Sequence, residues 1–255
     1  MRFWDGYKGS SFFELLELDY PQVKPDLGSW LATSGELPET SHGTTCVAVR
    51  WADGALVAGD RLATMGHQVG YRDIEKVYAT DDYSLMAIAG AAGPAIEMAR
   101  LLGIQFEHHE KIAGEPLELE GKANTLASLS KQNLPAAMQG LVGVPLFAGF
   151  DRRRRTGRVW KYEATGGRFE EMEFDSVGSG SIFAKESLKK SFVPGASRDQ
   201  VIRAALEALT DAADEDRATG GVDLLREIYP RIKLVTDQGV EDVGDGEISQ
   251  VYQDI

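Results

Sequence analysis

Cysteine is nearly absent from this chain of 255 residues, which carries only Cys46. No disulfide can form within the chain, so its cysteine content predicts a reducing cytoplasm. Long apolar runs are also lacking, and none approaches the length of a membrane-spanning helix. The stretch Met1-Arg2-Phe3-Trp4-Asp5 lacks the apolar centre of a secretory signal. We therefore expect a cytoplasmic protein that does not enter membranes.

Positive charge is in deficit, because 27 Lys and Arg residues stand against 40 Asp and Glu, a net charge of −13. This balance argues against nucleic acid as the main partner. Histidines number four, and His108-His109 has no partner at the spacing of a metal site. We expect no metal and no cofactor. The apolar share of 43% is ordinary for a globular protein, and the length suits one large domain or two small ones.

Residues 1–43 differ from the rest of the chain. Apolar residues between positions 12 and 18 predict a short amphipathic turn or two, and Pro21, Pro25 and Pro38 then interrupt regular structure. A strand pattern begins at Gly43-Thr44-Thr45. The leader, as we call residues 1–43, is either a flexible arm or a propeptide with a small docking helix. The remaining residues, 44–255, form the main domain.

Strands and helices follow one another in blocks from residue 44 onwards. Because they do not alternate as βαβ units, the pattern favours antiparallel sheets with helices on their outer faces. Ser197 and Gln200 form a predicted capping box before the apolar stripe of residues 201–213. Strands are predicted over 44–50, 55–59, 84–89, 142–150, 159–162, 169–172, 174–177, 231–236 and 240–243, and helices near 96–106, 122–138, 182–192 and 201–213.

The spacing of Thr44, Asp60 and Lys76, sixteen residues apart in each case, suggests a nucleophile that carries its own base. If the bond before Thr44 is cut, its hydroxyl can attack while its freed α-amine takes the proton. That amine has a reference pKa of roughly 7.7–8.0, so much of it is neutral at working pH. Lys76 would stay charged and lower the effective pKa of the hydroxyl, and Asp60 would hold Lys76 as an ion pair.

Each of these residues also has an ordinary interpretation: a strand threonine, a turn aspartate and a surface lysine. The turn Gly90-Ala91-Ala92-Gly93 could supply a backbone N–H for an oxyanion or could simply join a strand to a helix. Gly43 would tolerate strained backbone angles and put no bulk beside the attacked carbonyl.

Other candidates carry less weight. Cys46 and His42 invite a Cys/His hypothesis, but Cys46 is better interpreted as core packing. The arginines at 152–155 lie in a predicted hairpin loop, where solvated side chains are the simpler interpretation. Gly178-Ser179-Gly180 could bind phosphate at a helix start, but no P-loop lysine accompanies it.

Taken together, these motifs resemble a proteasome β-subunit of the actinobacterial type, over essentially all of residues 44–255. The resemblance rests on five segments in order: Gly43-Thr44-Thr45, Ala58-Gly59-Asp60-Arg61 with Lys76, Ala87-Ile88-Ala89-Gly90, Gly178-Ser179-Gly180-Ser181 and Asp216-Arg217-Ala218-Thr219-Gly220. It implies a four-layer αββα sandwich, an α+β fold of the N-terminal-nucleophile hydrolases. It also implies that the leader is a propeptide removed by self-cleavage between Gly43 and Thr44.

The resemblance implies roles for individual residues. Thr44 is the nucleophile, Asp60 and Lys76 tune it, and Gly90 stabilises the oxyanion. Ser179, Asp216 and Thr219 hold the amine and a catalytic water, with Thr219 standing where serine is commoner. The backbones of Thr64 and Ala92 bind the extended substrate. The specificity pocket maps to Ala63, Ile74, Tyr78, Ile88, Ala92 and Ile96, which predicts cleavage after hydrophobic residues.

The resemblance further implies stacked seven-membered rings with α-subunits and other β-subunits, an ATP-dependent unfoldase ring, and unfolded polypeptides as substrates. Two alternatives remain. A different N-terminal-nucleophile amidohydrolase would form a discrete small oligomer. A non-catalytic ring scaffold would typically lack the threonine, the lysine or the processing glycine, all of which are present here.

Overall fold

The computed structural model describes residues 43–65, 68–138 and 140–255. The predicted amphipathic turns between positions 12 and 18, and His42, lie outside the described residues. Among the described helices, none has the length and apolarity needed to cross a bilayer.

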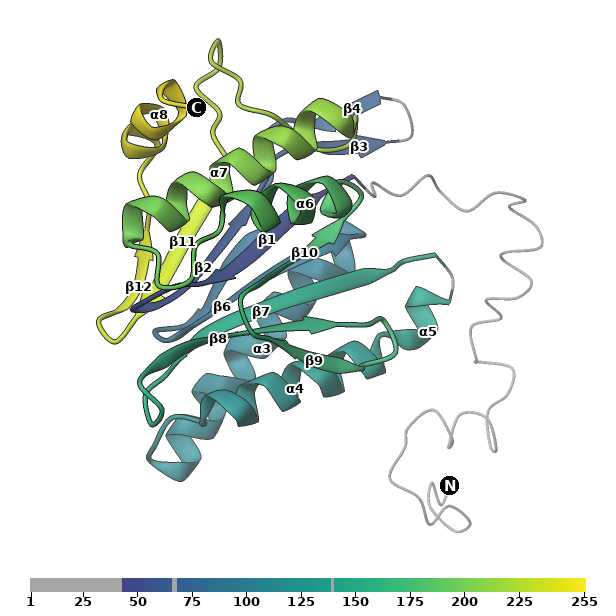
Figure 1. Cartoon of the computed structure of the whole chain (residues 1–255). Helices are drawn as coiled ribbons and strands as arrows, with labels where there is room; N and C mark the ends of the chain where they lie inside the picture. The colour runs from purple at the N-terminus through teal and green to yellow at the C-terminus, as the bar shows by residue number, and fades with distance from the viewer. Residues whose placement is uncertain (1–42, 66–67, 139) are drawn as a thin grey trace, which may run out of the picture. The chain divides into compact units, whose positions relative to one another are not determined.

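Two five-stranded antiparallel sheets form the centre of the structure (Figure 1). The first has the order β10-β1-β2-β11-β12 and the second β5-β6-β7-β8-β9, while β3 and β4 form a separate hairpin. The strands are β1 (Thr45–Arg50), β2 (Gly54–Gly59), β3 (Ala63–Met65), β4 (Gln68–Tyr71), β5 (Val77–Asp81), β6 (Ser84–Gly90), β7 (Gly143–Asp151), β8 (Thr156–Tyr162), β9 (Arg168–Glu171), β10 (Phe174–Gly178), β11 (Arg231–Thr236) and β12 (Gly239–Asp242).

Helices cover the outer face of each sheet (Figure 1). Helices α6 and α7 pack on the first sheet, and α3 and α4 pack on the second. The helices are α3 (Ala92–Ala113), α4 (Leu119–Gln132), α5 (Leu134–Ala137), α6 (Ser181–Ser191), α7 (Arg198–Glu215) and α8 (Asp245–Gln253). The predicted capping box of Ser197 and Gln200 is present at the start of α7.

Three apolar cores separate the four layers, and alternate residues of one strand enter different cores. In β1, Val47 and Val49 face the α6–α7 layer, whereas Cys46 and Ala48 face the second sheet. In β6, Met86 and Ile88 face α3 and α4, whereas Leu85, Ala87 and Ala89 face the first sheet. This period of two in central strands buried on both faces confirms the predicted αββα sandwich.

The structure also corrects parts of the predicted pattern. The helix predicted over 122–138 breaks at Asn133, because Pro135 opens the separate short helix α5. Helix α8, strand β5 and the hairpin β3–β4 were not predicted. Ile96 was counted in the apolar spacing of its helix, but it is 51% exposed, while Ala95, Met98, Ala99, Leu102 and Phe106 are the buried residues of α3.

Candidate active site

The register of β1 brings two distant segments to Thr44 and Thr45. On one side Cys46 pairs with Gly59, so that the N–H of Asp60 donates to the Thr45 carbonyl at 3.1 Å. On the other side Thr45 pairs with Gly178, so that the N–H of Ser179 donates to the Thr44 carbonyl at 2.9 Å. Antiparallel pairing therefore fixes the position of both segments at the start of β1.

Asp60 and Lys76 form an ion pair that is almost completely buried. Lys76 Nζ lies 2.7 Å from Asp60 Oδ1 and also donates to the Leu62 carbonyl at 2.6 Å. The Asp60 carboxylate accepts further hydrogen bonds from the backbone N–H groups of Thr45, Leu62 and Gly220, at 2.8, 3.0 and 2.8 Å. A buried carboxylate with four donors is well compensated, so the pair is rigidly held.

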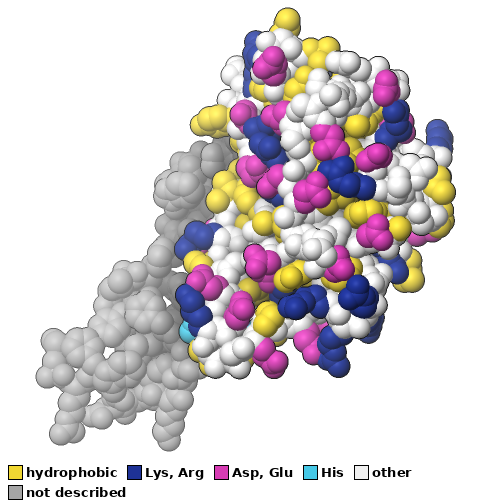
Figure 2. Space-filling model, turned by 90° about the vertical axis from the view of Figure 1, so that its left-hand side faces the viewer, with side chains coloured by type: hydrophobic (Ala, Val, Ile, Leu, Met, Phe, Trp, Pro, Cys, Tyr) yellow, Lys and Arg dark blue, Asp and Glu magenta, His cyan; other side chains and the backbone are white. Residues whose placement is uncertain are grey.

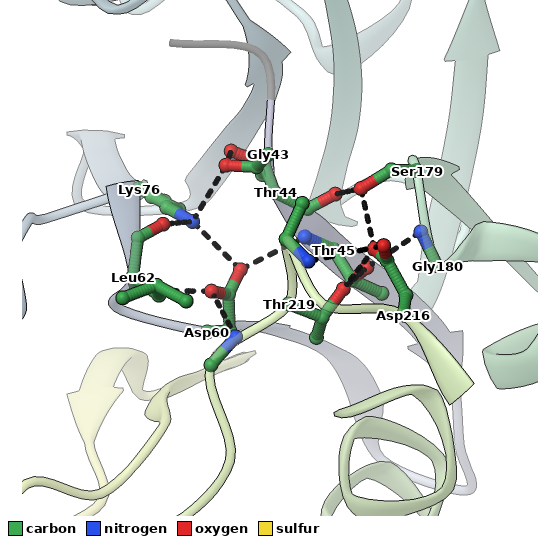
Figure 3. Close-up of polar contacts among 12 residues, drawn as sticks. Gly43, Thr44, Thr45, Asp60, Leu62, Lys76, Ser179, Gly180, Asp216 and Thr219 are labelled. Atoms are coloured by element: carbon green, nitrogen blue, oxygen red, sulfur yellow. Dashed lines mark hydrogen bonds and ion pairs between the residues drawn. The ribbon is translucent and has the colours of Figure 1, made fainter. Parts of the chain in front are cut away.

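The hydroxyl of Thr44 lies against the peptide bond that precedes it (Figure 3). Thr44 Oγ1 is 2.5 Å from the Gly43 carbonyl oxygen, and Lys76 Nζ approaches the same oxygen at 3.4 Å. Among the described residues, Lys76 thus contacts the Gly43 carbonyl, and no hydrogen bond joins it to Thr44 Oγ1. An ammonium at this place can stabilise negative charge that develops on the carbonyl oxygen.

Gly43 lies in a space that no side chain can enter. A Cβ on this residue would be 2.5 Å from Ala218 Cβ, 2.6 Å from the Ala218 carbonyl oxygen and 2.7 Å from Thr64 Oγ1. The expectation that glycine avoids bulk here agrees with this geometry. Gly43 is not among the glycines with positive φ, so its position does not depend on a left-handed backbone conformation.

A second polar cluster lies on the side of Thr44 away from Lys76 and consists of Ser179, Asp216 and Thr219 (Figure 3). Asp216 Oδ2 accepts from Ser179 Oγ at 2.5 Å and from Thr219 Oγ1 at 2.6 Å, and Oδ1 accepts from the Ala218 N–H at 3.1 Å. Burial opposes ionisation of Asp216, but these hydrogen bonds outweigh it and hold the pKa below its ordinary value. The carboxylate therefore stays ionised at neutral pH.

Thr45 extends this network in one direction. Thr219 has one hydroxyl proton, which it donates in the hydrogen bond to Asp216. In the 2.5 Å contact between Thr219 Oγ1 and Thr45 Oγ1, Thr45 must therefore be the donor. The Thr45 oxygen in turn accepts from the Gly180 N–H at 3.0 Å. Ser179 likewise donates its one hydroxyl proton to Asp216. The lone pairs of Ser179 Oγ can therefore accept a hydrogen bond from a donor beside Thr44.

A mainly apolar pocket lies next to Thr44. Its volume is only about 20 Å³, room for a single water. Burial, and then the charge of Glu75, raise the pKa of the Tyr78 phenol to about 12, so the pocket wall stays neutral there. The lining residues are Gly43, Thr44, Ala63, Ile74, Glu75, Lys76, Tyr78, Ile88, Gly90, Ala92, Ala95 and Ile96.

The pocket brings together all six residues that the resemblance assigned to specificity. Thr64 is not among the lining residues, but its hydroxyl borders the space around Gly43. Gly90 has φ +117°, and a Cβ there would lie 2.0 Å from the Val142 carbonyl oxygen, so this position requires glycine.

Sequence reasoning missed several contributors to the site. Three groups form hydrogen bonds with predicted residues: Thr45 with Thr219, the Ala218 N–H with Asp216, and the Leu62 carbonyl with Lys76. The Gly180 N–H donates to Thr45. Thr45 had a signal, because it sits inside Gly43-Thr44-Thr45. The others act mainly through backbone atoms, which leave no residue-type signal in a sequence.

The packing around Cys46 decides between its two interpretations. Cys46 is fully buried in the core between the sheets, where burial raises its pKa to about 12, so it is an unreactive thiol. Within the described residues, no group of three or more His, Cys, Asp or Glu could hold a metal ion.

The arginine loop makes local contacts rather than a basic patch. Arg153, Arg154 and Arg155 pair with Glu118, Asp151 and Asp237, and the Arg152 guanidinium lies over the Tyr83 ring at 4.7 Å. On the face drawn in Figure 2, acidic and basic side chains are interspersed.

Comparisons with known proteins identify the family of this chain. The family model of the proteasome subunit matches residues 40–225. A proteasome subunit beta of Frankia casuarinae is 47% identical over 242 residues, covering 95% of this chain and 88% of the relative. Those of Acidothermus cellulolyticus and Rhodococcus erythropolis are 46% and 47% identical, each covering 96% of this chain and 86% and 87% of the relative. The chain therefore belongs to the proteasome subunit family.

Proposed function

We propose that the chain is a threonine endopeptidase subunit of a 20S proteasome core, and that it activates itself by cutting the bond between Gly43 and Thr44. The observation that carries this proposal is the position of Thr44 Oγ1, 2.5 Å from the Gly43 carbonyl oxygen, which Lys76 Nζ also approaches. Residues 1–43 are then a propeptide and residues 44–255 the catalytic domain.

Self-cleavage follows from this arrangement. Thr44 Oγ1 attacks the Gly43 carbonyl carbon, and Lys76 stabilises the negative charge on the carbonyl oxygen. The C–N bond then breaks, the amine takes a proton, and an ester joins Gly43 to the Thr44 hydroxyl. Water hydrolyses the ester, which releases the propeptide and leaves Thr44 with both a hydroxyl and an α-amine.

In the mature subunit the same residues act on substrate. The α-amine of Thr44 takes the hydroxyl proton during attack, and Lys76, held by Asp60, lowers the hydroxyl's effective pKa. The Gly90 N–H stabilises the oxyanion of the substrate. Ser179 accepts a hydrogen bond from the amine, because its own hydroxyl proton is donated in a hydrogen bond to the Asp216 carboxylate. Thr219 completes the network around a catalytic water.

Replacing Gly43 by alanine should stall maturation. The added Cβ would collide with Ala218 and Thr64, so the scissile carbonyl must move away from Thr44 Oγ1. A displacement of about 1 Å is expected to slow self-cleavage about 10²-fold. The rate of propeptide loss is measured by intact-mass spectrometry. Gly246→Ala, where a Cβ meets nothing within 4 Å, is the matched control and should mature at the wild-type rate.

The apolar pocket supports cleavage after hydrophobic residues. Ile88 is buried in its wall and Ile96 is half exposed at its rim, so an apolar side chain would gain contacts with both. The backbones of Thr64 and Ala92 would hold the substrate as an added strand. Since the pocket has room for only about one water, it must widen to admit a tyrosine or leucine.

Fluorogenic peptides test this specificity. Peptides that end in Tyr or Leu before the reporter should be hydrolysed at least about tenfold faster than matched peptides that end in Arg, measured as kcat/KM. Faster hydrolysis of the Arg peptide would refute the assigned pocket.

Assembly and location complete the proposal. The chain would form stacked heptameric rings with α-subunits and other β-subunits in the cytoplasm. There an ATP-dependent unfoldase would feed it unfolded polypeptides. Mixing the chain with an α-subunit tests this proposal. We expect a particle of several hundred kilodaltons that gains peptidase activity, whereas a small oligomer would indicate a different amidohydrolase.

A further inference from the structure

A second hollow adjoins Gly90 from the side opposite the apolar pocket. The apolar pocket reaches Gly90 from β5 and α3, whereas this hollow of about 360 Å³ reaches it from β7, β8 and β10. Ala89, Gly90 and Val144 line one wall, Lys161 lies on β8, and Ser179 and Ser181 lie at the turn into α6. The hollow therefore opens beside two residues of the proposed catalytic site, Gly90 and Ser179.

Among the residues that the structure describes, Lys161 is the one charged residue that lines this hollow. Its ammonium donates to Asp175 Oδ1 at 3.1 Å and to the Ser176 carbonyl at 3.2 Å, which uses two of its three N–H donors among the described residues. Asp175 is itself buried behind the hollow and shares a second lysine, Lys185, at 2.9 Å. The ammonium of Lys161 is thus held in place and keeps a donor for a ligand.

The start of α6 also lines the hollow, through Ser181. Ser181 begins this helix of 11 residues, and the described residues of its first turn include no acid. A helix N-terminus favours negative charge nearby, and the hydroxyl of Ser181 can donate a hydrogen bond. The lysine, the helix terminus and this hydroxyl together suit a carboxylate, in contrast to the apolar pocket across Gly90.

We propose that this hollow is a subsite for an acidic substrate residue on the leaving-group side of the scissile bond. The inference rests on the proposed peptidase function. Gly43, which precedes the bond cut in maturation, lies in the apolar pocket, so the residues before a scissile bond belong there. The chain that follows the bond then leaves on the other side of Gly90, where Ser179 and Lys161 line the hollow.

Internally quenched peptides that span the cleavage site test the subsite on the assembled particle. Two peptides share a Leu before the bond and differ by Glu or Lys in the two positions after it. We expect the wild-type particle to cleave the Glu peptide about three- to fivefold faster, as kcat/KM, because a partly exposed ion pair discriminates to this extent. In Lys161→Met the ratio should fall to about 1, and Lys161→Arg should retain it.

Two controls separate the subsite from the catalytic site and from the fold. Lys185→Met also removes a lysine from Asp175 but does not change the lining of the hollow, so it should keep the wild-type ratio. Aminocoumarin peptides have no residue after the scissile bond, and their hydrolysis should be equal in wild type and Lys161→Met. Equal rates for the Glu and Lys peptides in an active wild-type particle would overturn the subsite alone. If the assembled wild-type particle fails to hydrolyse the aminocoumarin peptides, the proposed function itself is overturned, and the subsite with it.

Discussion

The Thr44→Ala variant is expected to assemble with its partner subunits, keep residues 1–43 and hydrolyse no peptide. The substitution removes Oγ1, the atom that lies 2.5 Å from the Gly43 carbonyl oxygen and that would attack both the propeptide and the substrate. Loss of a nucleophile lowers the rate by about 10⁴-fold or more. The measurements are intact mass after assembly and the hydrolysis of a fluorogenic Leu peptide.

Two control variants test whether the hydroxyl at position 44 is itself required. Thr44→Ser retains a hydroxyl and should mature, whereas Thr80→Ala removes a buried threonine hydroxyl in the second sheet, away from the site, and should mature fully. If Thr44→Ala loses residues 1–43 at the wild-type rate, another group cuts the bond and the assignment of Thr44 is wrong.

The Lys76→Met variant should show the second large loss. Methionine roughly preserves the volume of lysine but removes the ammonium that contacts the Gly43 carbonyl and pairs with Asp60. Asp60 would keep its three backbone donors, so the local structure is expected to survive. We expect self-cleavage and peptide hydrolysis each to fall by at least about 10²-fold, the usual effect of losing one charge-stabilising donor.

Lys122→Met is the matched control, because Lys122 is also a buried lysine and pairs with Asp81 outside the site. It should lower thermal stability while maturation proceeds. Normal maturation of Lys76→Met, or a maturation defect of equal size in Lys122→Met, would show that Lys76 has only a structural role.

The order of strands and helices could be predicted because it depends on local periodicity. β1 and β6 alternate between two cores, and the apolar stripe of α7 follows its capping box. The elements that were missed have weak local signals. In α8 only Ile248 is buried, and the described side chains of β4 lie mostly at the surface.

The site could be predicted only in part. Spacing suggested Thr44, Asp60 and Lys76, but it could not show that the β1 register would place Asp60 and Ser179 on opposite sides of Thr45. Resemblance supplied the distal residues. The contact of Lys76 with the Gly43 carbonyl, the exclusion of a side chain at Gly43 by Ala218 and the direction of the Thr45–Thr219 hydrogen bond depend on three-dimensional geometry.

Amine-selective labelling of the assembled, peptide-degrading particle tests the central claim most directly. Reductive methylation followed by digestion and mass spectrometry identifies which residue carries the α-amine. The account predicts a labelled N-terminal peptide that begins Thr44-Thr45-Cys46, with no peptide that spans Gly43 and Thr44. An active particle in which Thr44 remains joined to Gly43 would contradict it.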